Sequence, residues 1–154
     1  VRTPMTREVR RVDASSIAEA GRLPHPVRAW WAHMPIPYLI VEASSAGEVS
    51  GATPDIRALE ATEAGDATLL FARDDAAVRA RFFAPGLGVD EDPATGSAAV
   101  ALAAVMFFEG EGTGSLVVTQ GVEIGHPSEI RIGWDGPSVA LGGSVRPEEP
   151  RSLP

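Results

Sequence analysis

Apolar residues run without a charge from Ala98 to Phe108. A helix that lies on the surface of a sheet carries a polar stripe, but SAAVALAAVMFF (residues 97–108) shows none after its first residue. The stretch is too short to span a bilayer, because its residues would rise only about 18 Å as a helix. We therefore expect a helix over residues 97–108 that is buried on all sides.

Short strand patterns, each bounded by Gly, Pro or Ser, surround this stretch in the sequence. They cover residues 38–44, 67–73, 77–84, 114–120, 128–134 and 138–145. In one of them, Val78, Ala80 and Phe82 take alternate positions, as in a strand with a buried face. Short helices are expected over residues 15–21, capped by Ser15 or Ser16, and over residues 53–61, capped by Thr53.

The central helix is rich in alanine and therefore slim, so that it would fit inside a curved sheet. The pattern predicts an α+β fold in which a β-barrel-like curved sheet wraps around a buried central helix. Residues 1–37, rich in Arg and Pro, are expected to form an irregular segment available for an interface. Residues 38–147 would form the folded unit and residues 148–154 a solvated tail. For Trp30 and Trp31, packing in a core or interface is favoured over stacking on a ligand.

Charge and cysteine content exclude several classes of function. With 13 basic and 21 acidic residues, the net charge is −8, which disfavours nucleic acid and anionic membranes as partners. The absence of cysteine excludes disulfides, thiolate metal sites and cysteine nucleophiles. The three histidines lack ligand spacing, so no metal is expected. The first residues lack the apolar core of a signal peptide, and we expect a cytoplasmic protein.

The candidate site lies where the acidic cluster 90–92 meets the apolar helix. Pro93 pushes Asp92 away from helical angles, so the helix begins later, with Thr95 as the cap candidate. The free N–H groups of Gly96, Ser97 and Ala98 would then lie at the positive end of the helix dipole, where a carboxylate or phosphate binds readily. The alternative is that Thr95 and the acids only cap the helix. Because a buried helix begins at the edge of the core, we favour a binding cleft.

Other catalytic patterns are absent from the sequence. It contains no GK[ST] or G-x-G-x-x-G signature for nucleotides and no G-x-S-x-G nucleophile elbow. His126 lies between two expected strands. An exposed loop histidine is the favoured interpretation, and a position at the cleft is the alternative.

Three blocks of the sequence resemble the PhzF family, the phenazine-biosynthesis isomerase-like proteins. They are RFFAPGLGVDEDPATGSAAVALA (residues 81–103), VTQGVEIGHPSEI (residues 118–130) and the Gly-Gly step at residues 142–143. The D-P-A-T-G-S-A block is the most specific of them. The resemblance covers about the final two-thirds of the chain well and the segments PIPYLIVEA and TPDIRAL more loosely.

The resemblance implies a fold related to diaminopimelate epimerase, with two similar halves and the active site between them. It further implies a proton shift that uses a glutamate and neither a metal nor an organic cofactor. Asp92 would orient the substrate by hydrogen bonding, and Gly96 and Ser97 would hold its carboxylate. Thr95, Ala98 and Glu91 complete the expected substrate-binding set.

The chain departs from the family pattern in length and at one position. Family members are about twice as long, and the glutamate and its accompanying histidine belong to the N-terminal half, which nothing here matches. His126 stands where the family commonly has arginine. We expect either pairing with an N-terminal-half partner chain, a homodimer that rebuilds both halves, or a non-catalytic relative.

Two functions from different classes follow. The first is a PhzF-like isomerase that moves a proton on a small carboxylated metabolite, with this chain holding the carboxylate. Glu91 is the local candidate for carrying the proton if no other half supplies it. The second is a small-anion-binding or interaction module without chemistry.

Overall fold

The protein is described by a computed structural model that covers residues 1–6, 8–62 and 67–144. Its strands are β1 (Arg2–Pro4), β2 (Val9–Arg11), β3 (Arg28–His33), β4 (Pro37–Glu42), β5 (Thr68–Asp74), β6 (Ala77–Ala84), β7 (Val89–Asp92), β8 (Thr113–Gln120), β9 (Ser128–Asp135) and β10 (Ser138–Gly143). Its helices are α1 (Ser15–Ala20), α2 (Ala46–Gly51), α3 (Ile56–Glu60), the 3-10 turn η1 (Pro85–Leu87) and α4 (Gly96–Phe108).

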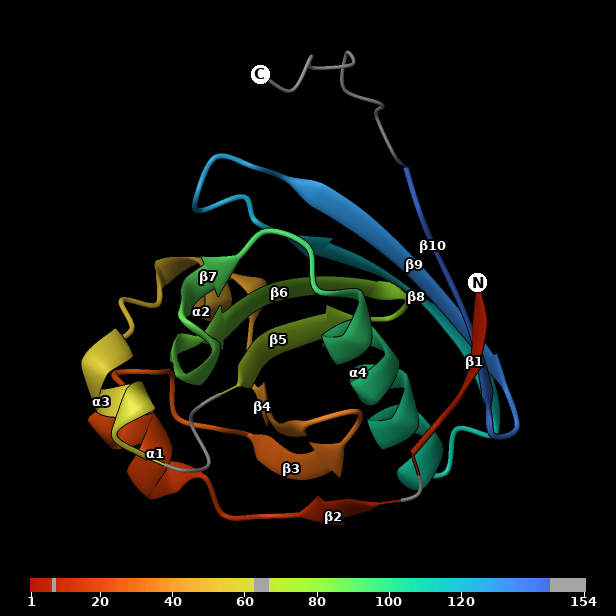
Figure 1. Cartoon of the computed structure of the whole chain (residues 1–154), viewed down its shortest axis with the longest axis horizontal. Coiled ribbons are helices and arrows are strands. Elements are labelled where there is room, and N and C mark those ends of the chain that lie inside the picture. The colour runs from red at the N-terminus through yellow and green to blue at the C-terminus, as the bar shows by residue number, and fades with distance from the viewer. Residues whose placement is uncertain (7, 63–66, 145–154) are drawn as a thin grey trace, which may run out of the picture.

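All the strands of the described residues belong to one curved sheet. Its order is β1-β10-β9-β8-β6-β5-β4-β3-β2, with β7 added beside β6. Neighbours are antiparallel except for the β4–β5 and β6–β8 pairs. Figure 1 shows the sheet curving around α4, with β1 and β10 on the right of the view and β2 and β3 below the helix. The predicted α+β fold, a curved sheet around a central helix, is confirmed.

The helix α4 is the centre of the main core. Every residue from Ala98 to Met106 is buried, and only the two ends of the helix reach solvent, at Ser97 and at Phe107 and Phe108. The alanines allow the surrounding strands to approach closely, and inward side chains such as Ile40, Phe71 and Trp134 fill the remaining space. The prediction of a helix buried on all sides is confirmed, with its start one residue earlier.

A second apolar layer lies on the outer face of the sheet. Figure 1 shows α1, α2 and α3 outside the barrel, on the side away from α4. Beneath them are outward-facing residues of β4, β5 and β6, among them Leu39, Leu70 and Phe83. Because both faces of these strands are covered, β4 and β5 read as nearly continuous apolar runs.

Residues 1–37, expected to be irregular, instead contain β1, β2, α1 and β3. The first strand pairs with β10, and the second with β3, so this segment supplies both ends of the sheet. Strands of three residues are too short to show an alternating pattern, and their partners are distant in sequence, which is why local pattern missed them. Trp30 is fully buried in the main core. The interface role of this segment stays a prediction, and the predicted tail, residues 148–154, lies outside the described residues.

Helix caps also differ from the expectation. Ala14, not Ser15 or Ser16, is the N-cap residue of α1, and the Asp13 carboxylate accepts a hydrogen bond from the Ser15 N–H at 2.9 Å. The cap of α3 is Asp55 rather than Thr53, since the Asp55 carboxylate accepts a hydrogen bond from the Ala58 N–H at 3.0 Å. A carboxylate is the stronger acceptor at a helix start, where the dipole is positive.

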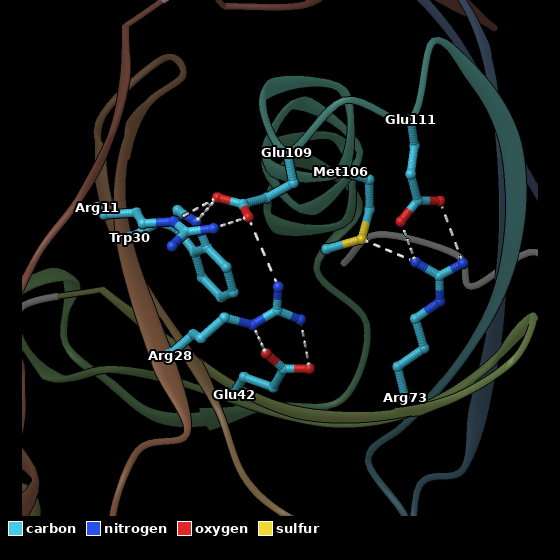
Figure 2. Close-up of polar contacts among 8 residues, drawn as sticks. All are labelled: Arg11, Arg28, Trp30, Glu42, Arg73, Met106, Glu109 and Glu111. Carbon is cyan, nitrogen blue, oxygen red and sulfur yellow. Dashed lines mark hydrogen bonds and ion pairs between the residues drawn. The ribbon is translucent and has the colours of Figure 1, made fainter.

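The C-terminal end of α4 is tied to one side of the barrel by Glu109. Its carboxylate accepts hydrogen bonds from Arg11 and, at 2.8 Å, from the indole N–H of Trp30. Arg28 lies 3.6 Å away and pairs more closely with Glu42, at 2.6 Å (Figure 2). The helix end is therefore joined to β2 and β3.

The opposite side of the same helix end is held by Glu111. Both of its carboxylate oxygens accept hydrogen bonds from Arg73 of β5, at 2.5 and 3.2 Å. The same guanidinium lies 3.0 Å from the sulfur of Met106 (Figure 2). An alanine-rich helix has few large side chains that would prevent it from sliding along its own axis. The contacts of Glu109 and Glu111 therefore help to fix the position of α4 within the curved sheet.

The Glu109 cluster predicts a pH-dependent stability. Its hydrogen bond to Arg11, assisted by Trp30 and Arg28, lowers the pKa of Glu109 from 4.5 to about 2. A lowered folded-state pKa stabilises the protein above the unfolded pKa, and this contribution is lost as the pH falls from 4.5 toward 2. We expect Glu109→Gln to cost about 1–2 kcal/mol at pH 7, because Arg11 is largely exposed and screened by solvent.

The measurement is urea unfolding of both proteins between pH 7 and pH 2.5. The difference between them should shrink steadily below pH 4.5. Glu60→Gln, at an exposed position of α3, is the control and should follow the wild type at every pH. A Glu109→Gln difference that stays constant over this range would contradict the assigned ion pairs.

Candidate functional site at the start of helix α4

The start of α4 carries backbone N–H groups that the helix itself cannot pair. Thr95 is the N-cap residue, as predicted, and Gly96, Ser97 and Ala98 form the first turn. The first N–H groups of any helix have no partner within it. No side chain caps this one. The N–H groups of Gly96 and Ser97 therefore stay available at the positive end of the helix dipole, whereas Ala98 is fully buried.

The hydroxyl of Thr95 does not act as the predicted cap. It donates a hydrogen bond to the Asp92 carboxylate at 2.6 Å and accepts one from the Gln120 amide at 3.0 Å. A charged acceptor makes the stronger hydrogen bond, so the hydroxyl turns toward Asp92 and away from the helix N–H groups. The result leaves the helix end open and fixes the Asp92 side chain.

The turn between β8 and β9 supports this segment from behind. The buried Gln120 donates to the carbonyl of Asp92 at 2.6 Å, and Ser128 donates to the carbonyl of Pro93, also at 2.6 Å. Gly121 packs so closely that an added Cβ would lie 2.8 Å from the Pro93 Cα. These supports were missed from the sequence, although Gln120, Gly121 and Ser128 fall within a block that resembles the family.

Asp92 and Glu91 have separate environments. Asp92, opposite Phe82 in the β6–β7 pair, is half-buried beside the helix start. Glu91 is the adjacent residue of the strand, and consecutive side chains of a strand point to opposite faces. Both of its oxygens accept hydrogen bonds from the buried Arg81, at 2.9 and 2.8 Å.

This ion pair defines what Glu91 contributes. Arg81 also donates to the carbonyl of Ala52, and its hydrogen bonds with Glu91 raise the pKa of Arg81. A carboxylate held at both oxygens by a buried guanidinium is poorly placed to carry a proton. The structure thus brings Asp92 and residues 95–98 together and holds the Glu91 carboxylate against Arg81.

Ser97 has a partner that the sequence reasoning did not include. The phenol O–H of Tyr38, in β4, donates to the Ser97 hydroxyl oxygen at 2.8 Å. Tyr38 is only 3% exposed, whereas Ser97 is exposed. A lone tyrosine in a largely apolar strand was the available signal, since a buried phenol needs a hydrogen-bond partner.

Other polar candidates lie elsewhere. His126 is exposed in the β8–β9 turn, as the favoured interpretation had it. Within the described residues, no group of three or more His, Asp or Glu side chains could hold a metal ion. In the same part of the chain, no helix has the length and apolar character needed to cross a membrane.

A cavity of about 400 Å³ lies near the other end of α4. Its lining is almost wholly apolar and consists of Met5, Thr6, Val9, Ala104, Phe107, Phe108 and Pro137. This lining contains neither an acid/base group nor a counter-charge for an anion. This cavity is therefore not the candidate site.

A family model described as "Phenazine biosynthesis-like protein" matches residues 2–145. The chain belongs to the PhzC-PhzF family. The match includes the N-terminal strands as well as the blocks around α4, so these strands are part of the PhzC-PhzF unit.

Individual relatives agree with this assignment. An uncharacterized isomerase of Mesorhizobium japonicum is 46% identical over 61 residues, which are 38% of this chain and 20% of that protein. The PhzF-family protein of Enterococcus faecalis has a TM-score of 0.67 at 23% identity, over 93% of this chain and 49% of its own. The PhzF-family protein of Bacillus anthracis has a TM-score of 0.70 at 16% identity, over 93% and 56%. The chain spans about half the length of these solved PhzC-PhzF relatives.

Proposed function

We propose that the chain supplies the carboxylate-binding half of a PhzF-type isomerase. The observation that carries this proposal is the open first turn of α4, where backbone N–H groups and the Ser97 hydroxyl lie next to a held Asp92. Such a helix end binds carboxylates through its unpaired N–H groups and its dipole. The ligand class is a small carboxylated metabolite.

The proposed reaction is a proton shift that needs no change in oxidation state. A base removes a proton from the carbon next to the bound carboxylate, and a proton returns to another carbon of the same conjugated system. The helix end and Ser97 stabilise the negative charge that develops beside the carboxylate. Asp92, fixed by Thr95, orients polar groups of the substrate.

The proton carrier is proposed to come from a second half of the site. The commitment of Glu91 to Arg81 supports this, because it removes the local candidate. An N-terminal-half partner chain or a second copy of this chain would supply it. The alternative function is a small-anion-binding module that catalyses no reaction. The Glu91–Arg81 ion pair favours this alternative if no second half exists, because the chain then lacks a proton carrier.

Ser97→Ala tests the binding half of the proposal. We expect it to weaken the binding of benzoate, an inert aromatic carboxylate, by roughly tenfold, because a hydrogen bond to a charged ligand is lost. Binding is followed by the backbone amide NMR signals of Gly96 and Ala98 during titration. Ser16→Ala, at an exposed position of α1, is the control. Equal benzoate affinity in wild type and Ser97→Ala would contradict the proposed site.

Turnover separates the isomerase from the binding module. Cyclohex-2-ene-1-carboxylate can lose a proton next to its carboxylate and regain one across its double bond. In heavy water, this chain together with the half that supplies the proton carrier is expected to introduce deuterium into this acid if the protein is an isomerase. A binding module would shift the same amide signals without any exchange.

A further inference from the structure

We propose that Tyr38 is a positioning residue that aims the Ser97 hydroxyl at the bound carboxylate. The inference rests on the proposed function of the α4 start. Tyr38 itself lies below the surface, at 3% exposure, and its hydroxyl reaches the site by the hydrogen bond to Ser97. It comes from β4, 59 residues away in the sequence, so the contact exists only in the folded chain.

The direction of this hydrogen bond decides what Ser97 can do. A phenol O–H is more acidic than an aliphatic alcohol and is the better donor, so Tyr38 donates and the Ser97 oxygen accepts. The proton of Ser97 is then left to point away from Tyr38, toward the exposed side of the first turn. There it can donate to a carboxylate bound at the N–H groups of the helix. Donors that are linked in a chain also polarise one another, which strengthens the outer bond.

Tyr38 is itself held in one place. Its backbone pairs with Ala32 of β3, and its ring packs against Phe82, with the ring centres 5.9 Å apart. Phe82 is also the residue opposite Asp92 in the β6–β7 pair. The same packed core therefore positions both polar side chains of the site. Because the hydrogen bond from Tyr38 already restricts the rotation of the Ser97 hydroxyl, this hydroxyl loses little further conformational freedom when the ligand binds.

The test is a double-mutant cycle of Tyr38→Phe and Ser97→Ala. Tyr38→Phe keeps the ring and its packing on Phe82 and removes only the hydroxyl. We expect it to weaken benzoate binding by roughly three- to tenfold in the wild-type background. In the Ser97→Ala background it should have no effect, because the group that it aims is gone.

Equal weakening in both backgrounds would assign Tyr38 a general structural role and overturn the inference. The inference is equally overturned if Tyr38→Phe has no effect while Ser97→Ala weakens binding, and the proposed function then stands. If Ser97→Ala itself leaves benzoate binding unchanged, the proposed function fails first. Urea unfolding of each variant accompanies the titrations, so that only folded protein is compared.

A spectroscopic measurement gives a second, independent readout. Tyr38 is the sole tyrosine of the chain, so ring-labelled ¹³C tyrosine gives a single Cζ signal. Benzoate is expected to move this signal in the wild type, because the ligand changes the Ser97 hydroxyl that the phenol contacts. In Ser97→Ala the signal should not respond to benzoate. A Tyr38 signal that ignores benzoate in the wild type contradicts the inference.

Discussion

Gly121→Ala is expected to lower the free energy of unfolding by about 3–5 kcal/mol, through a left-handed backbone that disfavours a Cβ and a clash with backbone that cannot yield. Gly121 has φ +76°, and an added Cβ would lie 2.4 Å from the carbonyl oxygen of His126 and 2.8 Å from Cα of Pro93. Both contacts are with backbone, so no side chain can rotate out of the way. The measurement is urea unfolding followed by circular dichroism.

Gly125→Ala is the matched control for this prediction. Gly125 lies in the same turn and has nearly the same φ, +75°, but an added Cβ would meet nothing within 4 Å. It should therefore show the backbone cost alone, about 1–2 kcal/mol. In folded Gly121→Ala protein, the amide signals of Gly96 and Ala98 should also move, since Pro93 is pushed. If the two variants lose equal stability, the turn does not support the site as described.

Glu91→Gln is the second large effect, with an expected loss of about 3–5 kcal/mol from leaving a buried guanidinium without its counter-charge. The side chains of Arg81 and Glu91 are only 8% and 11% exposed, and their two hydrogen bonds are well formed. Glu129→Gln removes the partner of Arg131 on the surface, where the pair is 65% and 47% exposed. That control should cost less than about 1 kcal/mol.

The same variant also tests the role of Glu91 in binding. In folded Glu91→Gln protein, benzoate affinity is expected to match the wild type, because the carboxylate faces Arg81. A variant of wild-type stability that has lost benzoate binding would instead return Glu91 to the substrate-binding set. A role of Glu91 as the partner of Arg81 predicts lower stability with unchanged benzoate affinity. A role in substrate binding predicts unchanged stability with lower affinity.

The local hydrophobic pattern was enough to predict those helices and strands whose surroundings are the same along their whole length. The helix over residues 97–108 was predicted within one residue, because a segment without a polar stripe has no surface on which to lie. The alternation in β6 correctly placed Val78, Ala80 and Phe82 inside. Where both faces of a strand are buried, as in β4, the apolar run predicted the strand. It did not show that an apolar layer covers each of the two faces.

Strands at the N-terminus could not be found in the same way. β1 and β2 have three residues each, and their pairing with β10 and β3 satisfies backbone groups, which the side-chain pattern does not reveal. The helix α2, which covers the outer face of the sheet, was also missed, because its local pattern is not informative by itself. Its Ser45 cap and the buried Val49 become informative only once the outer face of the sheet is known.

The sequence by itself determined the central helix, most of its surrounding strands and the position of the helix start at residues 95–98. Each follows from local rules: apolar periodicity, proline before a helix, and the unpaired N–H groups of a first turn. Only the tertiary structure decided how the neighbouring side chains are used. It paired Glu91 with Arg81 and Ser97 with Tyr38, and it placed Gln120 against Thr95, whose hydroxyl donates to Asp92. Tyr38 comes from β4, 59 residues away from Ser97, and Arg81 comes from β6, the antiparallel neighbour of the strand that carries Glu91. These two partners are therefore set by the folded sheet.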